Sequence, residues 1–373
     1  MLAPHAPGTK QHESLGGVAV RRFRYLWPAT LETVCYQGGT LINLRKKPFN
    51  YAKLPALIFF EWWQTMSWLR TGKFDLLHSH WLLPQGFVGV MAAGPLALPH
   101  VCTVHGSDIF GLHGALLEKF KAITVRHVNA VTVNSSATRR AVAELCPETA
   151  PLHTIPMGVA VRSSGLREQG QSAAIRARFR RGQGPLLLFV GRLVEEKGLA
   201  DLLEALCLLR DRHNDMTLLV IGEGQERASF ERQSAERGLT GQVFFGGWVE
   251  PEQLFDYFAA ADIFTAPSRT EAQGLTIIEA MMAGRPVVAT RTGGIVDSVA
   301  HEVSGLLISE RSPNELAAAI TRLVNDPELA QRLGRRAHHE ARAKFSRETS
   351  AAQFSELFTS LIQARKAGSR PGR

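Results

Sequence analysis

The 373-residue sequence lacks most of the features that mark secreted, metal-stapled or membrane-spanning proteins. Its four cysteines lie far apart in the chain, so they fit neither a disulfide framework nor a zinc-binding pattern. The longest apolar stretch, residues 54–69, is interrupted by Glu61 and Gln64 and does not predict a membrane-spanning helix. The first residues show no basic region followed by an apolar run, as a secretory signal would. We therefore expect a cytoplasmic protein with reduced thiols.

The composition excludes wholesale disorder and a fibrous structure. Hydrophobic residues make up 45% of the chain, the usual share in a globular protein, and 33 glycines with 18 prolines are too few for a fibre. The length corresponds to two domains and allows large cores without disulfide or metal cross-links.

Positive charge exceeds negative charge by nine, since 43 basic residues face 34 acidic ones. Two segments account for this excess: residues 162–181 carry six arginines and one glutamate, and residues 365–373 carry four basic side chains. A solvated linker and a frayed tail would explain both segments. Attraction to an anionic membrane surface or substrate is the functional alternative. A nucleic-acid-binding protein would instead carry a basic stripe on a folded face.

Short runs of strand-forming residues alternate with helix-length amphipathic stretches, a pattern that predicts parallel sheets with helices on both faces. The expected strands are 17–23, 75–79, 100–104, 130–134 and 152–156, then 185–190, 216–221, 242–245, 262–266, 286–290 and 305–308. The polar, Arg-rich segment 159–184 separates two α/β halves. We expect an amino-terminal domain over residues 1–160 and a carboxyl-terminal domain over 161–345. Residues 346–373 should form a helix that packs back toward the first domain.

Ligands of open α/β sheets bind beyond the carboxyl ends of the strands. In the second half, the run Leu186–Val190 is followed by residues 191–198, which place Arg192 and Lys197 in a loop that enters a helix. A guanidinium and an ammonium near free helix N–H groups can bind phosphate. An ordinary exposed loop is the alternative, and the Gly-Lys-Ser/Thr ending of a nucleotide-triphosphatase loop is absent.

Two further glycine pairs follow strands. Gly222 and Gly224 lack the third glycine of a dinucleotide fingerprint, so a tight strand-to-helix turn is favoured over a ligand site. Residues 246–249, ending at Val249, could line a base pocket through their backbone or form an ordinary turn.

The sharpest motif lies in residues 267–280, after the expected strand 262–266. Apolar residues at helical spacing predict a helix that begins near Gly274, so the N–H groups of Gly274, Leu275 and Thr276 would face an anion. Glu271 would then precede the helix and Glu279 would lie inside it. Carboxylates accept hydrogen bonds from vicinal hydroxyls, so this spacing suits a sugar, a diphosphate and a ribose in sequence. Helix-start charge would explain Glu271 but not Glu279.

These motifs, together with residues 279–288 and 292–295, resemble the retaining glycosyltransferases of family 4 in order and spacing. That family has the GT-B fold, in which two Rossmann-like domains with parallel sheets face each other across a cleft. The resemblance implies that Arg192 and Lys197 hold the donor diphosphate, Glu279 the ribose and Glu271 the transferred sugar. The backbone around Gly274–Thr276, with Gly222 and Val249, would complete the donor site. It implies neither a metal ion nor another cofactor.

The amino-terminal half resembles the same family more loosely. Residues 74–81 resemble a strand ending in a histidine pair, and 103–108 resemble the loop whose histidine, here His105, reaches the transferred sugar. A structural role after a strand is the alternative for His105. The family usually begins with a strand, a Gly-rich loop and a helix, whereas residues 1–8 resemble its second strand and following loop. We therefore expect the first domain to lack its first strand–helix unit, which bears on acceptor binding.

Three other interpretations remain open at this stage. His78 and His80 point to one face of a strand and could bind a metal with His105 and Asp108, as in metal-dependent hydrolases. An inactive GT-B scaffold or a basic nucleic-acid-binding protein would account for the arginine cluster and the missing unit. The aromatic stretch 58–63 could lie at a membrane interface, although packing in a core is the commoner use of such a stripe.

The sequence thus predicts a hexosyltransferase that moves a sugar from a nucleotide-sugar donor to an acceptor with retention of anomeric configuration. It does not identify the nucleotide, the sugar or the acceptor, which could be a glycan, a lipid-linked molecule or a small molecule. Nucleic acid is not expected as a partner. The expected location is cytoplasmic, with peripheral binding at the inner face of the membrane as an open alternative.

Overall fold

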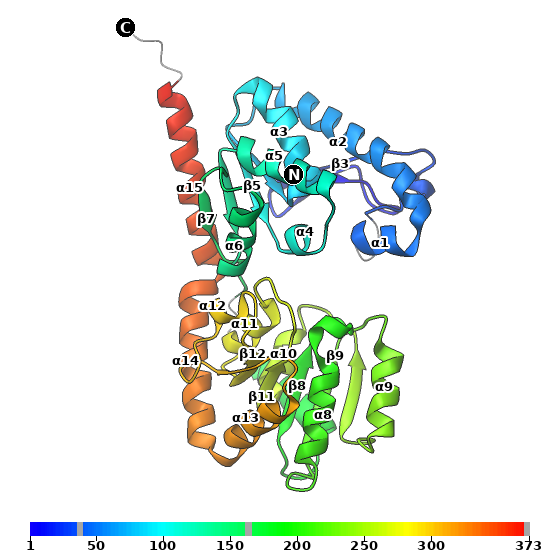
Figure 1. Cartoon of the computed structure of the whole chain (residues 1–373), viewed down its shortest axis with the longest axis vertical. Coiled ribbons are helices and arrows are strands. Elements are labelled where there is room, and N and C mark those ends of the chain that lie inside the picture. Colours follow the sequence, from blue (N-terminus) through cyan, green and yellow to red (C-terminus); the bar gives the residue numbers. More distant parts are fainter. Residues whose placement is uncertain (36–39, 161–165, 369–373) are drawn as a thin grey trace. The chain divides into compact units, whose positions relative to one another are not determined.

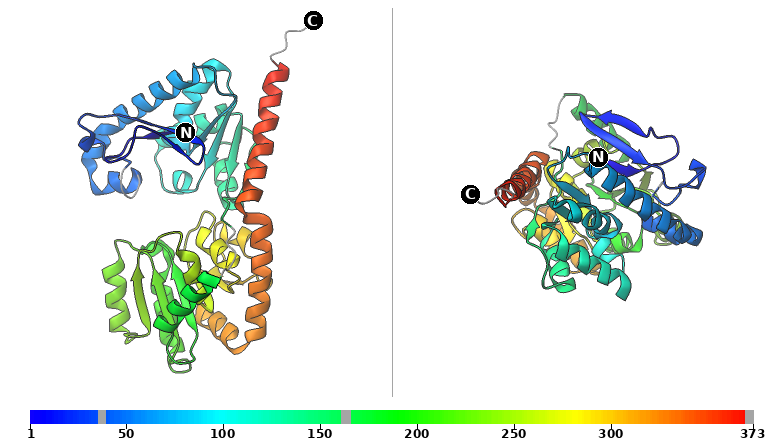
Figure 2. Two further views of the ribbon diagram at one scale, coloured as in Figure 1. Left: turned by 180° about the vertical axis from the view of Figure 1, so that it is seen from behind. Right: turned by 90° about the horizontal axis from the view of Figure 1, so that it is seen from above.

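The computed structural model describes residues 1–35, 40–160 and 166–368. Its contacts divide the chain into two compact units, each with its own sheets and helices (Figures 1 and 2). Unit 1 comprises Met1–Val133, Arg140–His153 and Glu356–Arg373, and unit 2 comprises Asn134–Arg139 and Thr154–Ser355.

Unit 2 is built on a six-stranded sheet in the order β10-β9-β8-β11-β12-β13. All five strand pairs are parallel. The strands are β8 (Leu186–Val190), β9 (Thr217–Ile221), β10 (Val243–Gly247), β11 (Ile263–Ala266), β12 (Val287–Thr290) and β13 (Leu306–Ile308). The chain therefore adds strands on one side of β8 and then crosses over to add the others on the opposite side.

The sheet of unit 2 is covered on both faces, which explains why its strands are continuous apolar runs. Successive side chains of β8 enter different cores: Leu187 and Phe189 pack in one cluster, and Leu186 and Leu188 pack in the other. Helices α8 (Leu199–Leu209), α9 (Arg227–Glu236) and α13 (Pro313–Asn325) contribute to the first cluster, and α10 (Leu254–Ala260) and α11 (Leu275–Met282) to the second. Helix α14 (Pro327–Phe345) contributes to both.

The segment expected to be a solvated linker is in part a built element, which corrects that expectation. Residues Leu166–Phe179 form helix α7, and Ile175 and Phe179 pack against the second core of unit 2. The guanidinium of Arg176 donates two hydrogen bonds to Asp262, at 2.7 and 2.9 Å, and a third to the carbonyl of Ala260. Arg176 therefore anchors α7 and is not available as part of a free basic patch. Arg162, and Arg370 and Arg373 of the tail, lie outside the described residues.

Unit 1 contains two sheets. The larger has the order β4-β5-β6-β7, and its pairs β4–β5 and β5–β6 are parallel. Its strands are β4 (Leu77–His80), β5 (His100–Val104), β6 (Ala130–Val133) and β7 (Leu152–Thr154). The helices of this unit are α1 (Thr40–Lys46), α2 (Leu54–Leu69), α3 (Phe87–Ala93), α4 (Ser107–Phe110), α5 (Ala115–His127) and the part of α6 (Ser136–Leu145) from Arg140 onward. Helix α15 (Arg347–Gly368) is divided between the units: its residues up to Ser355 belong to unit 2, and those from Glu356 onward belong to unit 1. There the Arg365 guanidinium donates to the carbonyl of Leu96.

The smaller sheet of unit 1 has the order β1-β3-β2 and differs from the all-parallel prediction. Strand β1 (Leu2–Pro4) pairs in parallel with β3 (Val18–Phe23), but β2 (His12–Leu15) pairs with β3 in antiparallel fashion. The two residues between β2 and β3, Gly16 and Gly17, both have positive φ, as the tightest hairpin turn requires. The sequence prediction missed β2 because its residues do not form an apolar run.

Glycines let the loops at the carboxyl edge of the unit 2 sheet touch backbone to backbone. A Cβ on Gly198 would lie 1.9 Å from the carbonyl oxygen of Pro267, and one on Gly222 would lie 1.9 Å from that of Gly191. A Cβ on Gly293 would meet the carbonyl oxygen of Glu271 at the same distance. No larger residue fits these positions unless the loops separate.

This contact can be tested by a matched pair of substitutions, because Gly198 and Gly284 share a φ of +70° but only Gly198 is crowded. Gly284→Ala should lower the free energy of unfolding by about 1–2 kcal/mol, the cost of the left-handed backbone. Gly198→Ala should lower it by at least about 2 kcal/mol more, because backbone atoms must also move. Urea unfolding followed by circular dichroism measures both. Equal losses of unfolding free energy in the two variants would show that the crowding at Gly198 does not affect stability.

Candidate active site

The candidate site lies at the crossover point of the unit 2 sheet. Strands β8 and β11 are neighbours, yet the chain leaves β8 toward β9 and leaves β11 toward β12 (Figure 1). Loops that follow two such strands diverge to opposite sides, and the space at their start is where open α/β sheets bind ligands. The loops here are residues 191–198 and 267–274.

The two loops bring together Lys197 and Glu271, which are 74 residues apart in the chain. The Lys197 ammonium forms an ion pair with the Glu271 carboxylate, and both side chains are mostly shielded from solvent. A second connection runs from the backbone N–H of Arg269 to the carbonyl of Glu196, at 2.8 Å. The Arg269 guanidinium also pairs with Glu195. The structure thus fixes the relative position of two residues that the sequence analysis had assigned to one site.

Arg192 lies at the start of the first loop, one residue after the backbone N–H of Gly191 bonds to the carbonyl of Ile221. Its side chain is exposed, and among the described residues it has no hydrogen-bond or ion-pair partner. Arg176, Arg227 and Arg269 of the same unit differ in this respect, since all three are paired with carboxylates. A guanidinium held beside this loop without a carboxylate partner can bind an anionic ligand.

Helix α11 begins directly after the second loop, with Gly274 at its N-cap in a left-handed conformation, φ +84°. The N–H groups of Leu275 and Thr276 belong to the first turn and have no acceptor within the helix. They add partial positive charge at the same end of the sheet as Lys197. Glu279 lies one turn further along α11 and is half-buried. The predicted start of the helix near Gly274 agrees with the structure.

The remaining predicted donor residues follow β9 and β10. The backbone N–H of Gly222 donates to the carbonyl of Gly247 at 2.8 Å, which ties the loops after these strands together. Val249 follows β10, and its half-buried side chain packs on the second core, whereas its neighbour Trp248 is 62% exposed. Gly222 and Val249 therefore belong to the same edge of the sheet as the Lys197–Glu271 pair.

His105 belongs to unit 1, where it directly follows β5. The buried carboxylate of Asp108 holds its loop by accepting backbone N–H bonds from His105, Gly106 and Leu82, at 3.0 to 3.1 Å. The ring of His105 stacks on that of His80, and His105 Nε2 lies 2.9 Å from His80 Nδ1. Burial lowers the pKa of His105 below its usual value, which favours a neutral ring that can both donate and accept.

The same geometry bears on the metal-dependent hydrolase alternative. His78 Nε2 is bonded to Thr103 Oγ1 at 2.7 Å, and His80 is bonded to His105. The part of the chain that the structure describes contains no group of three or more His, Cys, Asp or Glu side chains that could hold a metal ion. The histidines therefore form a hydrogen-bonded network, and this geometry gives the hydrolase alternative no support.

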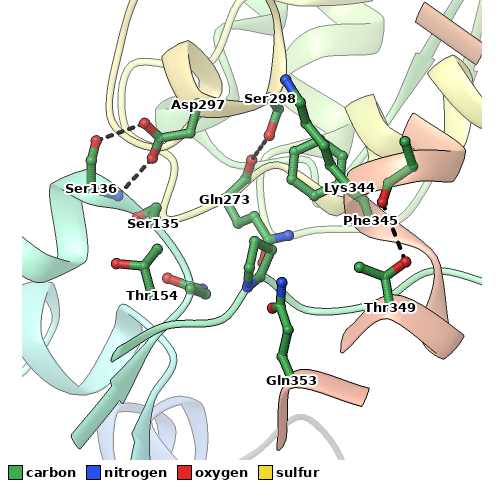
Figure 3. A pocket seen from close by; sticks show the side chains of 13 residues that line it. Ser135, Ser136, Thr154, Gln273, Asp297, Ser298, Lys344, Phe345, Thr349 and Gln353 are labelled. Carbon is green, nitrogen blue, oxygen red and sulfur yellow. Dashed lines mark hydrogen bonds between the residues drawn. The ribbon is translucent and has the colours of Figure 1, made fainter. Parts of the chain in front are cut away.

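A polar pocket of about 420 Å³ lies elsewhere in unit 2 (Figure 3). Asp297 accepts two hydrogen bonds from Ser136, and Ser298 Oγ donates to the carbonyl of Gln273 (Figure 3). The buried amide of Gln273 also exchanges two hydrogen bonds with the backbone of Met157. None of the predicted donor residues lines this pocket. Its lining residues form no sequence motif, because they are mostly ordinary polar types scattered between positions 134 and 353.

Comparisons with known proteins agree with this geometry. The model of the Glycosyltransferase Family 4 matches residues 3–162, and the model named Glycosyl transferases group 1 matches residues 171–340. The chain is 31% identical to the 2-deoxystreptamine glucosyltransferase of Streptomyces kanamyceticus over 274 residues, 68% of this chain and 69% of that protein. The chain belongs to the group 1 glycosyl transferases.

Other relatives and solved structures extend the comparison. A GDP-mannose-dependent alpha-(1-6)-phosphatidylinositol monomannoside mannosyltransferase of Mycobacterium tuberculosis is 31% identical over 235 residues, 61% of this chain and 60% of that protein. The sucrose-phosphate synthase of Thermosynechococcus elongatus superposes with a TM-score of 0.77 at 23% identity, covering 98% of this chain and 89% of that one. Anabaena HepE, solved with UDP, superposes with a TM-score of 0.71 at 23% identity, covering 79% and 82%.

These findings confirm several predictions from the sequence. The fold is the GT-B fold, the family is the one that the motifs resembled, and this group 1 glycosyl transferase is a hexosyltransferase. Within the described ranges, no helix combines the length and apolarity that crossing a bilayer demands.

The buried His100 makes the stability of unit 1 sensitive to acid. Burial lowers its pKa to about 4, its Nε2 is bonded to Ser79 Oγ at 2.8 Å, and its Nδ1 has no partner among the described residues. Protonation would bury a charge and an unpaired donor, so the folded state resists protonation and the unfolded state does not. The stability from a neutral His100 is complete above pH 6.5 and is lost as the pH falls toward 4.

His100→Gln should therefore reduce the pH dependence of the free energy of unfolding between pH 6.5 and 4. The slope should fall by up to about 1.4 kcal/mol per pH unit. Urea unfolding followed by tryptophan fluorescence measures this, because Trp27, Trp62, Trp63, Trp68 and Trp81 all lie in unit 1. His339→Gln, which changes an exposed histidine of α14, is the control. Identical pH slopes for wild type and His100→Gln would contradict this account.

Proposed function

We propose that this glycosyl transferase moves a sugar from a nucleotide-sugar donor with retention of anomeric configuration and without a metal ion. The donor diphosphate would bind at the loops that follow β8 and β11. The observation that supports this most strongly is the pairing of Lys197 with Glu271 at the crossover point of the sheet, beside the first turn of α11.

The chemistry demands positive charge where the nucleotide departs. Cleavage of the bond between the sugar and the diphosphate leaves negative charge on the leaving phosphate, and groups already aimed at that position stabilise it. Arg192 and Lys197 in the loop after β8, together with the free N–H groups at the start of α11, would supply this charge. Because these groups together can neutralise a diphosphate, the proposal requires no divalent cation.

The Lys197–Glu271 ion pair gives the free enzyme a defined resting state. A phosphate that binds Lys197 competes with Glu271 for the ammonium. The carboxylate released in this way can accept hydrogen bonds from the hydroxyls of the transferred sugar. On donor binding, Lys197 would thus pair with the phosphate in place of Glu271, and Glu271 would bind the sugar.

The other predicted residues would take the roles that the family resemblance implies. Glu279, deeper in α11, would bind the ribose hydroxyls, and the backbone near Gly222 and Val249 would contact the nucleotide. His105, neutral and fixed by His80, would bond to a hydroxyl of the transferred sugar. Support for a nucleotide-sugar donor comes from HepE, which has been solved in complex with UDP and with UDP-glucose. The mycobacterial relative is named as GDP-mannose-dependent, so the base must be determined by experiment.

Removing either cation should abolish donor binding. Thermal unfolding of the full chain in the presence of UDP-, GDP- and ADP-sugars should show a rise in Tm with the true donor, because a ligand that binds the folded state stabilises it. Lys197→Ala and Arg192→Ala should lose this rise, and transfer should fall by about 10²–10³-fold. The control Arg232→Ala removes an exposed guanidinium of α9 and should behave as wild type. Wild-type donor response in both variants would overturn the assignment of the site.

The stereochemistry and the metal requirement have separate readouts. With the donor identified, transfer should continue undiminished in EDTA, and proton NMR of the first product should show the anomeric configuration of the donor. Loss of activity in EDTA that added Mg²⁺ or Mn²⁺ restores would contradict metal independence. A product with the opposite anomeric configuration to the donor would contradict retention, but it would leave the assignment of the donor site intact.

A further inference from the structure

Helix α2 of unit 1 exposes aromatic side chains and buries its charged one. Its exposed positions are Pro55, Phe59, Trp63 and Ser67, which recur every four residues along one stripe. Phe59 is 55% exposed and Trp63 is 51% exposed, while the only charged residue of the helix, Glu61, is buried. A surface helix of a globular protein normally turns its charged residues outward and its aromatic residues inward. The outer face of α2 therefore needs an explanation other than contact with water.

The exposed rings continue beyond α2 into the neighbouring segments. Trp27, which is 63% exposed, packs edge-on against Phe60 with ring centroids 6.0 Å apart, and Phe60 in turn contacts Phe59 and Trp63. The turn before α2 adds two more exposed rings, Phe49 and Tyr51. We call this surface the aromatic face; it consists of Trp27, Phe49, Tyr51, Phe59 and Trp63.

Positive charge predominates in the segment that carries the aromatic face, although Arg22 is paired with Glu13 and Arg24 with Glu32. Residues 20–73 contain nine lysines and arginines and only two acidic residues, Glu32 and Glu61, both of which are buried. Glu32 is already bonded to His5 and Arg24. Lys46 and Lys47, just before the turn, are exposed. The net charge of the chain outside residues 162–181 and 365–373 does not reveal this local excess, because acidic residues elsewhere cancel it.

We propose that the aromatic face is a docking surface for a bilayer that contains anionic phospholipids. Tryptophan and tyrosine rings prefer the headgroup level, where an apolar body and a polar edge both find partners. Lysines beside them are attracted to lipid phosphates, and neither signal alone gives firm binding. The exposed rings, the exposed lysines and the two buried carboxylates all belong to residues 20–73 of unit 1, a combination that matches the charge and polarity of such a membrane.

Two other occupants fit the same surface less well. Bases of single-stranded RNA stack on open ring faces, but Arg24 covers Trp27 at 5.0 Å and Lys53 covers Phe49 at 5.9 Å. The remaining contacts along the face are mostly edge-on, which also presents few open faces. A second copy of the chain would bring two positively charged surfaces together, and like charges oppose that association.

The test is sedimentation of the full chain with vesicles of phosphatidylcholine alone and of phosphatidylcholine mixed with phosphatidylglycerol. The wild-type chain should bind the mixed vesicles and lose binding as salt rises, because salt screens the lysines. Phe59→Ser combined with Trp63→Ser should weaken this binding by more than about tenfold, since each ring transfers substantial apolar surface into the lipid. Lys46→Glu combined with Lys47→Glu should weaken it by about fivefold or more per position.

Matched controls distinguish binding through the aromatic face from nonspecific binding of exposed apolar or charged side chains. The response to donor shows separately whether the donor site is intact. Leu208→Ser removes an apolar side chain that is 50% exposed on α8, and Arg232→Glu reverses an exposed charge on α9. Both controls should bind vesicles as the wild type does, and all variants should keep the wild-type Tm and its response to donor. Absence of wild-type binding to mixed vesicles, or binding that survives the aromatic double substitution, overturns the proposal. So does a chain that binds single-stranded RNA or dimerises through this face and ignores the vesicles.

Discussion

The close approach of two loops at the carboxyl edge of the unit 2 sheet underlies the rest of the candidate site. Gly198 leaves no room for a side chain beside Pro267, so the loop after β8 and the loop after β11 meet through their backbones. This contact sets the distance over which Lys197 can reach Glu271. It also holds the start of α11 beside the same space. The proposed donor site would therefore depend on a glycine whose contribution is the absence of a side chain.

Much of this arrangement could be predicted from the sequence because parallel sheets obey strict rules. The run Leu186–Val190 has to be buried on both faces, and the loop after this strand has to lie at the sheet edge. The order of Lys197 and Glu271 along the chain then places both residues at that edge. Helix α11 begins where its apolar spacing indicates. Local patterns and one topological rule thus suffice for these elements.

Other features escaped prediction because they depend on contacts between distant segments. The hairpin strand β2 carries no apolar run and is defined by its partner β3 and two glycines. The role of Arg176 depends on Asp262, which lies 86 residues away in the chain. The outward orientation of Phe59 and Trp63 depends on which side of α2 the core occupies, and the aromatic composition of the helix leaves this open. Amphipathic periodicity identifies a helix reliably only when one face is polar.

The path of the chain has a consequence for how the protein forms during synthesis. Unit 1 begins with the first residues but is completed by the end of α15, where the ring of Phe358 packs against that of His78 in β4. A ribosome therefore releases nearly the whole of unit 2 before the last piece of unit 1 exists. Unit 2 also includes residues 134–139, which are synthesised within the first half of the chain. Neither unit is a continuous segment, so a nascent chain cannot complete unit 1 first and then add unit 2.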